Sequence, residues 1–198
     1  MNTRILLIRH AAHEDLGVRL TGRRCGVALT KAGHEQACHL AEHVAGEDIA
    51  ALQASPTHRA LQTAAIVGGR TGLGVQTTAA LDEIDFGGWT GRRYAELERD
   101  SRWQAWNVER ETGVTAGGES MAGVLHRLRC HLKRTSERFH DRTVAMVTHC
   151  DIIRTLVADI LGLSLNAVHR FDIPPASVSR ILAGDCGGKV ISLNETLQ

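Results

Sequence analysis

Residues 3–15 read TRILLIRHAAHED, and this stretch decides the fold. Four consecutive apolar residues, Ile5 to Ile8, are followed at once by Arg9 and His10. A short apolar run bounded by polar residues predicts a buried strand. In an open parallel sheet, ligands bind just beyond the carboxyl ends of the strands. The Arg-His pair is therefore either an accidental polar strand end or one edge of a binding site.

The composition fits one globular domain over residues 1–198. The chain is 43% hydrophobic and has a formal net charge of +1, so it does not indicate a surface for nucleic acid or a membrane span. Its five cysteines show no C-x-x-C spacing, which favours reduced thiols in a cytoplasmic protein over a disulfide framework or a zinc ribbon. They are Cys25, Cys38, Cys130, Cys150 and Cys186. The composition is compatible with a monomer or a homodimer.

Strands and helices alternate along the chain. Apolar runs predict strands at about 4–9, 50–54, 75–78, 143–148, 177–183 and 189–193. Helical patterns cover residues 29–46, 55–72, 118–140 and 151–162, with Thr30 as the N-cap of the first and Ser55-Pro56 opening the second. This alternation predicts an α/β fold, a three-layer α/β/α sandwich with a mostly parallel central sheet. Residues 84–118 are less regular, and we expect a helical excursion over the end of the sheet where a site would lie.

Two further predicted strands are followed by a histidine or an arginine, as the first strand is. In VAMVTHCDIIR (144–154), an apolar strand ends at His149 and a helix follows. In ASPTHRALQTA (54–64), Arg59 lies in the first turn of a helix. Arginine binds phosphate oxygens through two parallel hydrogen bonds, and a helix N-terminus adds free N–H donors. If these strands are parallel neighbours, their ends form a pocket for a phosphoryl group.

The sequence also offers groups for catalysis. A neutral imidazole can attack phosphorus and form a phosphohistidine. LDEIDFGGWTG (81–91) supplies three carboxylates, Asp82, Glu83 and Asp85. A carboxyl group held away from water has a raised pKa and can protonate a leaving alkoxide.

Together these segments resemble the histidine phosphatase superfamily, also called the phosphoglycerate mutase-like family. The resemblance rests on LIRHA, SPTHRALQTA, LDEIDFGGWTG, AGGES and VTHCDIIR, which occur in the family's order from Ile5 to Arg154. It implies a phosphoglycerate mutase-like fold and a metal-independent reaction without cofactors on a small-molecule phosphate ester. His10 matches the family's nucleophile, and Glu83 its proton donor. The other phosphate-pocket residues match Arg9, Arg59 and His149, whereas Asp82 and Asp85 are expected in a solvated turn.

This sequence departs from the family pattern at several positions. Ala11 stands where the family usually has Gly, and Cys150 follows His149 where a Gly is common. His13 is a candidate extra phosphate donor, although we favour an exposed loop histidine. Arg23 and Arg24 are candidate ligands for a second anionic group on the substrate, with a solvated basic loop as the equal alternative.

Other chemistries fit the sequence less well. Cys150 and Arg154 are too close in sequence for a cysteine phosphatase loop, and His34-Glu35…His39 is one residue too long for the zinc-binding helix motif. Within the resembled family, the few residues between Glu83 and Glu119 favour a phosphatase over a phosphoglycerate mutase. A non-catalytic phosphate-binding regulatory protein is a third alternative.

Overall fold

A six-stranded mixed sheet forms the centre of the computed structural model, which describes residues 2–184 and 187–196. Its strands are β1 (Asn2–Arg9), β2 (Ile49–Ala54), β3 (Val75–Thr77), β4 (Thr143–Thr148), β5 (Val178–Gly184) and β6 (Gly187–Glu195). They are arranged in the order β3-β2-β4-β1-β5-β6. The neighbours β3, β2, β4 and β1 pair in parallel, whereas β5 pairs antiparallel with both β1 and β6. The predicted mostly parallel α/β sheet is confirmed.

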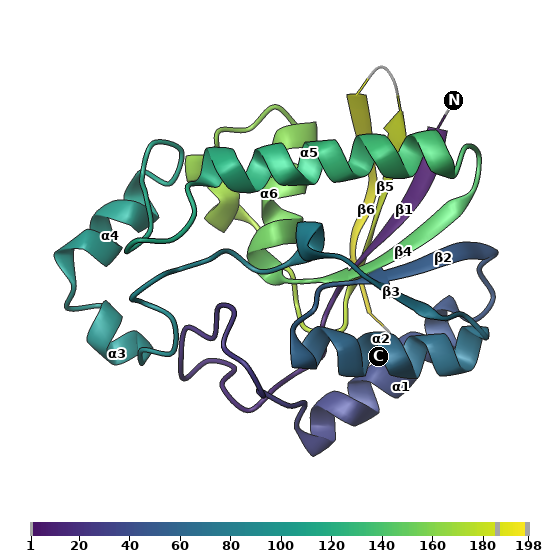
Figure 1. Ribbon diagram of the computed structural model, residues 1–198, viewed down its shortest axis with the longest axis horizontal. Coiled ribbons are helices and arrows are strands. Elements are labelled where there is room, and N and C mark those ends of the chain that lie inside the picture. Colours follow the sequence, from purple (N-terminus) through teal and green to yellow (C-terminus); the bar gives the residue numbers. More distant parts are fainter. Residues whose placement is uncertain (1, 185–186, 197–198) are drawn as a thin grey trace.

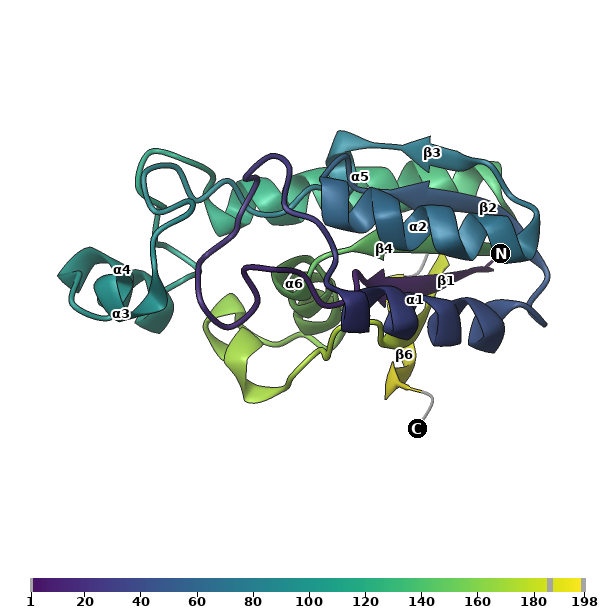
Figure 2. The ribbon, with the colours of Figure 1, turned by 90° about the horizontal axis from the view of Figure 1, so that it is seen from below.

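Helices cover both faces of the sheet, as Figures 1 and 2 show. α1 (Lys31–Val44) and α2 (His58–Thr71) lie on one face, and α5 (Met121–Arg138) and α6 (Cys150–Ile160) lie on the other. Side chains of a strand alternate between faces. Accordingly, Leu6 and Ile8 belong to the apolar cluster under α1 and α2, while Ile5 and Leu7 belong to the cluster under α5 and α6. A strand that is covered by helices on both faces needs apolar residues at every position, and this explains the continuous apolar run near the start of the chain.

Side-chain caps fix where two of these helices begin. The Thr30 hydroxyl accepts a hydrogen bond from the Gly33 N–H (3.0 Å), as the predicted N-cap of α1 requires. Ser120 does the same for Gly123 at the start of α5 (3.1 Å). The second helix begins at His58, three residues later than predicted, because Ser55 and Pro56 form the turn that leaves β2.

Residues 84–118 project past one end of the sheet (Figure 1). They contain two short helices, α3 (Tyr94–Leu97) and α4 (Ser101–Val108), and are otherwise irregular. The short 3-10 helices η1 (Ala79–Leu81) and η2 (Leu165–Arg170) lie elsewhere in the chain. An aromatic cluster anchors the projection: Trp89 and Trp106 are buried, and the centroids of their rings are 5.9 Å apart. Among the described helices, none combines the length and the apolar character needed to cross a bilayer.

Candidate active site

Two histidines lie side by side at the carboxyl ends of the central strands. β1 and β4 pair with Arg9 opposite Thr148, so His10 and His149 leave the sheet at the same level. The backbone N–H of His10 donates to the Thr148 carbonyl oxygen (2.9 Å), and the two imidazole centroids are 5.1 Å apart. The carboxyl ends of parallel strands lie at the same edge of a sheet, and this brings His10 and His149 together although they are distant in sequence.

Arg59 joins the two imidazoles from the first turn of α2. Its Nε donates to Nε2 of His10 (3.3 Å), and its Nη2 donates to Nδ1 of His149 (3.0 Å). The residue is only 1% exposed, and Nη2 also bonds to the Gly22 carbonyl oxygen (2.8 Å). Within the described part of the chain, the buried Nη1 has no hydrogen-bond partner.

Arg9 adds a second guanidinium group to the same cavity. It donates to the Ile173 carbonyl oxygen through Nη1, while its buried Nε finds no acceptor among residues 2–184 and 187–196. A buried cation is costly unless it is paired, and a guanidinium fork matches the oxygens of a phosphate. The unused donors of Arg9 and Arg59 are therefore suited to a phosphoryl group.

The hydrogen bonds assign a tautomer to each imidazole. Nδ1 of His10 lies 2.9 Å from the Ala11 carbonyl oxygen, so it carries the proton and leaves a lone pair on Nε2. Nδ1 of His149 accepts from Arg59, so Nε2 carries the proton and donates to the Ser55 hydroxyl (2.8 Å). Burial, reinforced by the charge of Arg59, lowers the pKa of both histidines well below the ordinary value. Both rings are therefore neutral at pH 7, and Nε2 of His10 carries a lone pair.

Glu83 supplies a carboxyl group with a suitable pKa. Its Oε2 lies 3.8 Å from Nδ1 of His149, and its Oε1 accepts from the Ile84 N–H (2.9 Å). Burial, and then the negative charge of Asp151, raise its pKa to about 7, although Arg59 acts in the opposite direction. A group with that pKa can give and take a proton at neutral pH.

The other two acids of the same loop hold it in place. Asp82 Oδ1 accepts from the Glu83 N–H (2.9 Å) and from the Ser55 hydroxyl (3.1 Å). Asp85 Oδ1 accepts from the Gly87 N–H (2.9 Å). Neither lines the cavity, so both act as turn residues. Asp82 is however mostly buried rather than solvated, because it connects Ser55 to the Glu83 backbone.

Arg23 and Arg24 do not line the cavity. Arg23 donates to the Glu83 carbonyl oxygen (2.7 Å) and to Glu119 Oε2 (2.8 Å), and so supports the acid loop from behind. Arg24 forms an ion pair with Asp15 (2.8 Å).

His13 lies in the cavity wall and is only 6% exposed, whereas the sequence favoured an exposed loop histidine. Its ring centroid is 5.0 Å from that of His10. The loop that carries it folds back on the chain, with the Glu14 N–H bonded to the Ala28 carbonyl oxygen (3.2 Å). Burial and the charge of Arg59 lower the pKa of His13 to about 4. The ring is therefore neutral at pH 7.

The two departures from the family pattern have local explanations. The Ala11 methyl group packs in a small apolar cluster with Leu29 and Ala37. Cys150 lines the cavity, but burial raises the pKa of its thiol to about 11, so it is not a thiolate. Like Cys25, Cys38 and Cys130, it is free; Cys186 lies outside the described residues.

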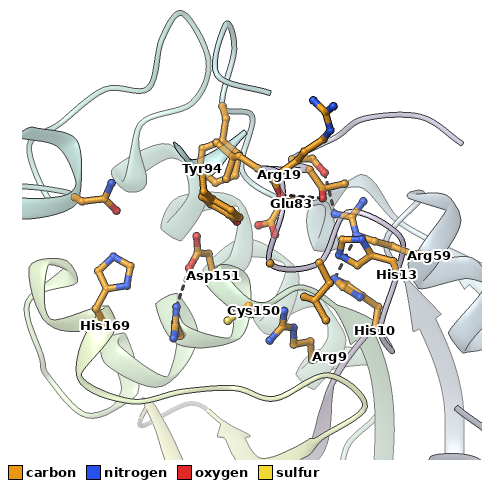
Figure 3. Close-up of a pocket in the computed structure, with 18 of the residues that line it drawn as sticks. Arg9, His10, His13, Arg19, Arg59, Glu83, Tyr94, Cys150, Asp151 and His169 are labelled. Atoms are coloured by element: carbon orange, nitrogen blue, oxygen red, sulfur yellow. Dashed lines mark hydrogen bonds and ion pairs between the residues drawn. The ribbon is translucent and has the colours of Figure 1, made fainter. Parts of the chain in front are cut away.

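Several residues that the sequence did not single out complete the cavity, whose volume is about 320 Å³. Figure 3 shows Tyr94, Asp151 and His169 on the side of the cavity away from His10, His13 and Arg59. Asp151 and Arg154 follow His149 in the first turns of α6, and that position was the available signal. Tyr94 and Arg110 come from the irregular projection, whose pattern carries no such signal.

Known proteins are similar to this chain in sequence and in fold over nearly its whole length. A sequence profile of the histidine phosphatase superfamily (branch 1) matches residues 5–196. Phosphoserine phosphatase 1 of Hydrogenobacter thermophilus is 29% identical, with 98% of this chain and 92% of that protein covered. Adenosylcobalamin/alpha-ribazole phosphatase of Escherichia coli is 27% identical, with 90% and 89% covered. The native structure of a mycobacterial glucosyl-3-phosphoglycerate phosphatase superposes with a TM-score of 0.88 at 25% identity, with 99% and 100% covered.

The chain belongs to the histidine phosphatase superfamily. It is a hydrolase that acts on phosphate monoesters, as the three relatives named above are.

Proposed function

We propose that this protein hydrolyses a small-molecule phosphate monoester in two steps, through a phosphohistidine on His10 and without a metal ion. The observation that carries the proposal is the buried lone pair of His10 Nε2, 3.3 Å from Arg59 Nε. This arrangement supports a nucleophilic role for His10, because the neutral ring lies beside a guanidinium group with an unused donor. The named phosphatase activities of the relatives support the same reaction.

In the first step, Nε2 of His10 attacks phosphorus and the bond from phosphorus to the alcohol oxygen breaks. Arg9 and Arg59 donate hydrogen bonds to the phosphoryl oxygens and balance their charge in the transition state. His149 joins them when the bound dianion favours its charged form, because Nδ1, which accepts from Arg59 in this structure, then carries a proton and becomes a donor. Glu83 gives its proton to the leaving oxygen, which departs as the alcohol.

In the second step, water attacks phosphorus and the bond to Nε2 breaks. The Glu83 carboxylate takes a proton from that water, which restores its acid form, and inorganic phosphate leaves. His13, beside His10 in the cavity wall, is an additional contact for a phosphoryl oxygen in this proposal.

Trapping of the covalent intermediate tests this mechanism. Wild-type protein is mixed with 4-nitrophenyl phosphate, quenched in alkali and analysed by mass spectrometry, and we expect an acid-labile phosphoryl group on His10. The variant His10→Ala should lose the adduct and several orders of magnitude of turnover, as removal of a nucleophile does. His58→Ala is the control, because His58 is exposed at the start of α2. Full activity in His10→Ala would refute the proposal.

Two further measurements separate the alternatives. Chelator treatment should leave the rate unchanged, and a large loss would point to a metal-dependent reaction. A mutase would interconvert 2- and 3-phosphoglycerate faster than it released phosphate, whereas a hydrolase releases phosphate from both.

A further inference from the structure

The peptide unit that joins Ala11 to Ala12 lies beside the His10 ring. Its carbonyl oxygen is 2.9 Å from Nδ1 of His10, and because a carbonyl oxygen only accepts, Nδ1 carries the proton and Nε2 the lone pair. If this peptide unit turned over, its N–H would face Nδ1, and the proton would move to Nε2. A ring protonated at Nε2 has no lone pair there with which to attack phosphorus. The orientation of one peptide unit therefore decides whether His10 is ready for the attack proposed above.

The second hydrogen bond to the His10 ring does not hold it during that attack. Arg59 Nε donates to Nε2 (3.3 Å) in this structure, but in the proposed mechanism Nε2 bonds to phosphorus and Arg59 donates to the phosphoryl oxygens. Of the hydrogen bonds that the described residues make to this imidazole, the one to the Ala11 carbonyl oxygen is then left. The tautomer and the orientation of the ring at the moment of attack therefore depend on that carbonyl group.

Helix α1 holds this peptide unit from outside the cavity. Oε1 of Gln36 accepts from the Ala12 N–H (3.0 Å), which is the other end of the peptide unit that faces His10. The Thr30 N–H, at the N-cap of the helix, donates to the Ala12 carbonyl oxygen (3.1 Å). Gly33 lets the helix come this close, because a Cβ there would overlap the same oxygen. Gly33 and Gln36 are three residues apart on one face of the helix, so α1 contacts both polar backbone groups of Ala12.

We infer that Gln36 is a positioning residue for the reaction: through the peptide unit between Ala11 and Ala12, it holds the His10 imidazole with its lone pair on Nε2. The inference rests on the attack by His10 proposed above. Gln36 is half-buried and does not line the cavity, so it acts only through the backbone. An acceptor at the N–H of a peptide also polarises the carbonyl group, because hydrogen bonds in a chain strengthen one another. Loss of the Gln36 oxygen should therefore slow the attack and leave phosphate binding unchanged.

Single-turnover kinetics on 4-nitrophenyl phosphate measure the attack by itself. With protein in excess, release of 4-nitrophenolate reports formation of the bond from Nε2 to phosphorus. Methionine has the length of glutamine but no oxygen, so Gln36→Met should lower this rate about 10-fold, which corresponds to one unmade buried hydrogen bond. The inhibition constant of inorganic phosphate, which reports binding in the pocket, should change less than about twofold. Gln36→Glu keeps an acceptor oxygen and should retain the rate to within about threefold.

Gln62→Met is the matched control. Gln62 is half-buried on α2, and its Oε1 also accepts from one backbone N–H, that of Leu29 (2.8 Å). We expect Gln62→Met to lower the urea midpoint of unfolding as much as Gln36→Met does, because each variant leaves one backbone N–H without its acceptor. The single-turnover rate of Gln62→Met should stay at the wild-type value.

Gln36→Asn keeps the test valid if Gln36→Met does not fold. Its shorter side chain withdraws the oxygen from the Ala12 N–H, so we expect a slower attack in this variant too. A wild-type rate in Gln36→Met, or equal losses of rate in Gln36→Met and Gln62→Met, would overturn the inference and leave the proposed hydrolysis standing. A rise in the phosphate inhibition constant as large as the fall in rate would show that Gln36 shapes the whole pocket, and would overturn the inference as well. If wild-type protein releases no 4-nitrophenolate, the inference and the proposed function both fail.

Discussion

Oε2 of Glu83 lies 3.8 Å from Nδ1 of His149, at the edge of the pocket that surrounds Nε2 of His10. A proton donor at this position must be protonated when the alcohol leaves. Because burial raises the pKa of Glu83 to about 7, kcat/KM for an alkyl phosphate should fall as the pH rises through about 7. A pH profile from 5 to 9 measures this limb. The leaving group of 4-nitrophenyl phosphate needs no proton, so kcat/KM for this ester should not fall in the same way. If kcat/KM falls through pH 7 for both esters, a group other than Glu83 is responsible for the fall.

Glu83→Gln removes the proton but keeps the shape of the side chain. We expect kcat/KM for alkyl phosphates to drop about 100- to 10,000-fold, the usual contribution of a general acid. The loss should be smaller for 4-nitrophenyl phosphate. Steady-state kinetics on both esters measure the difference. Equal losses would indicate that the substitution distorts the pocket rather than removing an acid.

The same variant should be more stable than the wild type above neutral pH. The folded protein binds the Glu83 proton more tightly than the unfolded chain does, so ionisation destabilises the fold as the pH rises from 4.5 to about 7. Glutamine is neutral at every pH. At about 1.4 kcal/mol per pKa unit, we expect Glu83→Gln to gain about 1–3 kcal/mol at pH 8. Urea unfolding at pH 8 and pH 4.5 checks this, and a gain of the same size at both would contradict it.

Ser55 connects His149 to the acid loop. Its hydroxyl lies 2.8 Å from His149 Nε2 and 3.1 Å from Asp82 Oδ1. Ser55→Ala should free the imidazole to rotate and lower kcat/KM about 10-fold or more, at a cost of about 1 kcal/mol in stability. Ser179→Ala is the control, because Ser179 is equally buried but bonds the Asn194 N–H on the far strands. If both variants lose the same activity, Ser55 has no positioning role.

Most of the site residues that the sequence predicted follow a strand or begin a helix, whereas Glu83, in the loop after η1, was predicted by the resemblance to the family. Strands with apolar residues on both faces indicate a covered sheet, and residues that follow such strands lie at its edge; His10 and His149 could be located by this rule. The sequence could not predict that β5 runs antiparallel to β1, because an apolar run is the same in a parallel and an antiparallel strand. Nor does a polar loop indicate that it folds back, which is why the burial of His13 was missed. Arg110 was missed for a related reason, because only tertiary packing brings it to the cavity.

Close packing of α1 against the loop after His10 should make Gly33 intolerant of substitution. A Cβ at Gly33 would lie 1.9 Å from the Ala12 carbonyl oxygen, which belongs to backbone that cannot yield without moving His10. We expect Gly33→Ala to destabilise the protein by about 1–3 kcal/mol or more and to lower activity. Gly69, in the last turn of α2, has nothing within 4 Å of its added Cβ, so Gly69→Ala should stabilise by about 0.5–1 kcal/mol with unchanged kinetics. Urea unfolding and kcat/KM of both variants provide the measurement. A Gly33→Ala protein with wild-type stability would show that α1 is free to move away from the pocket.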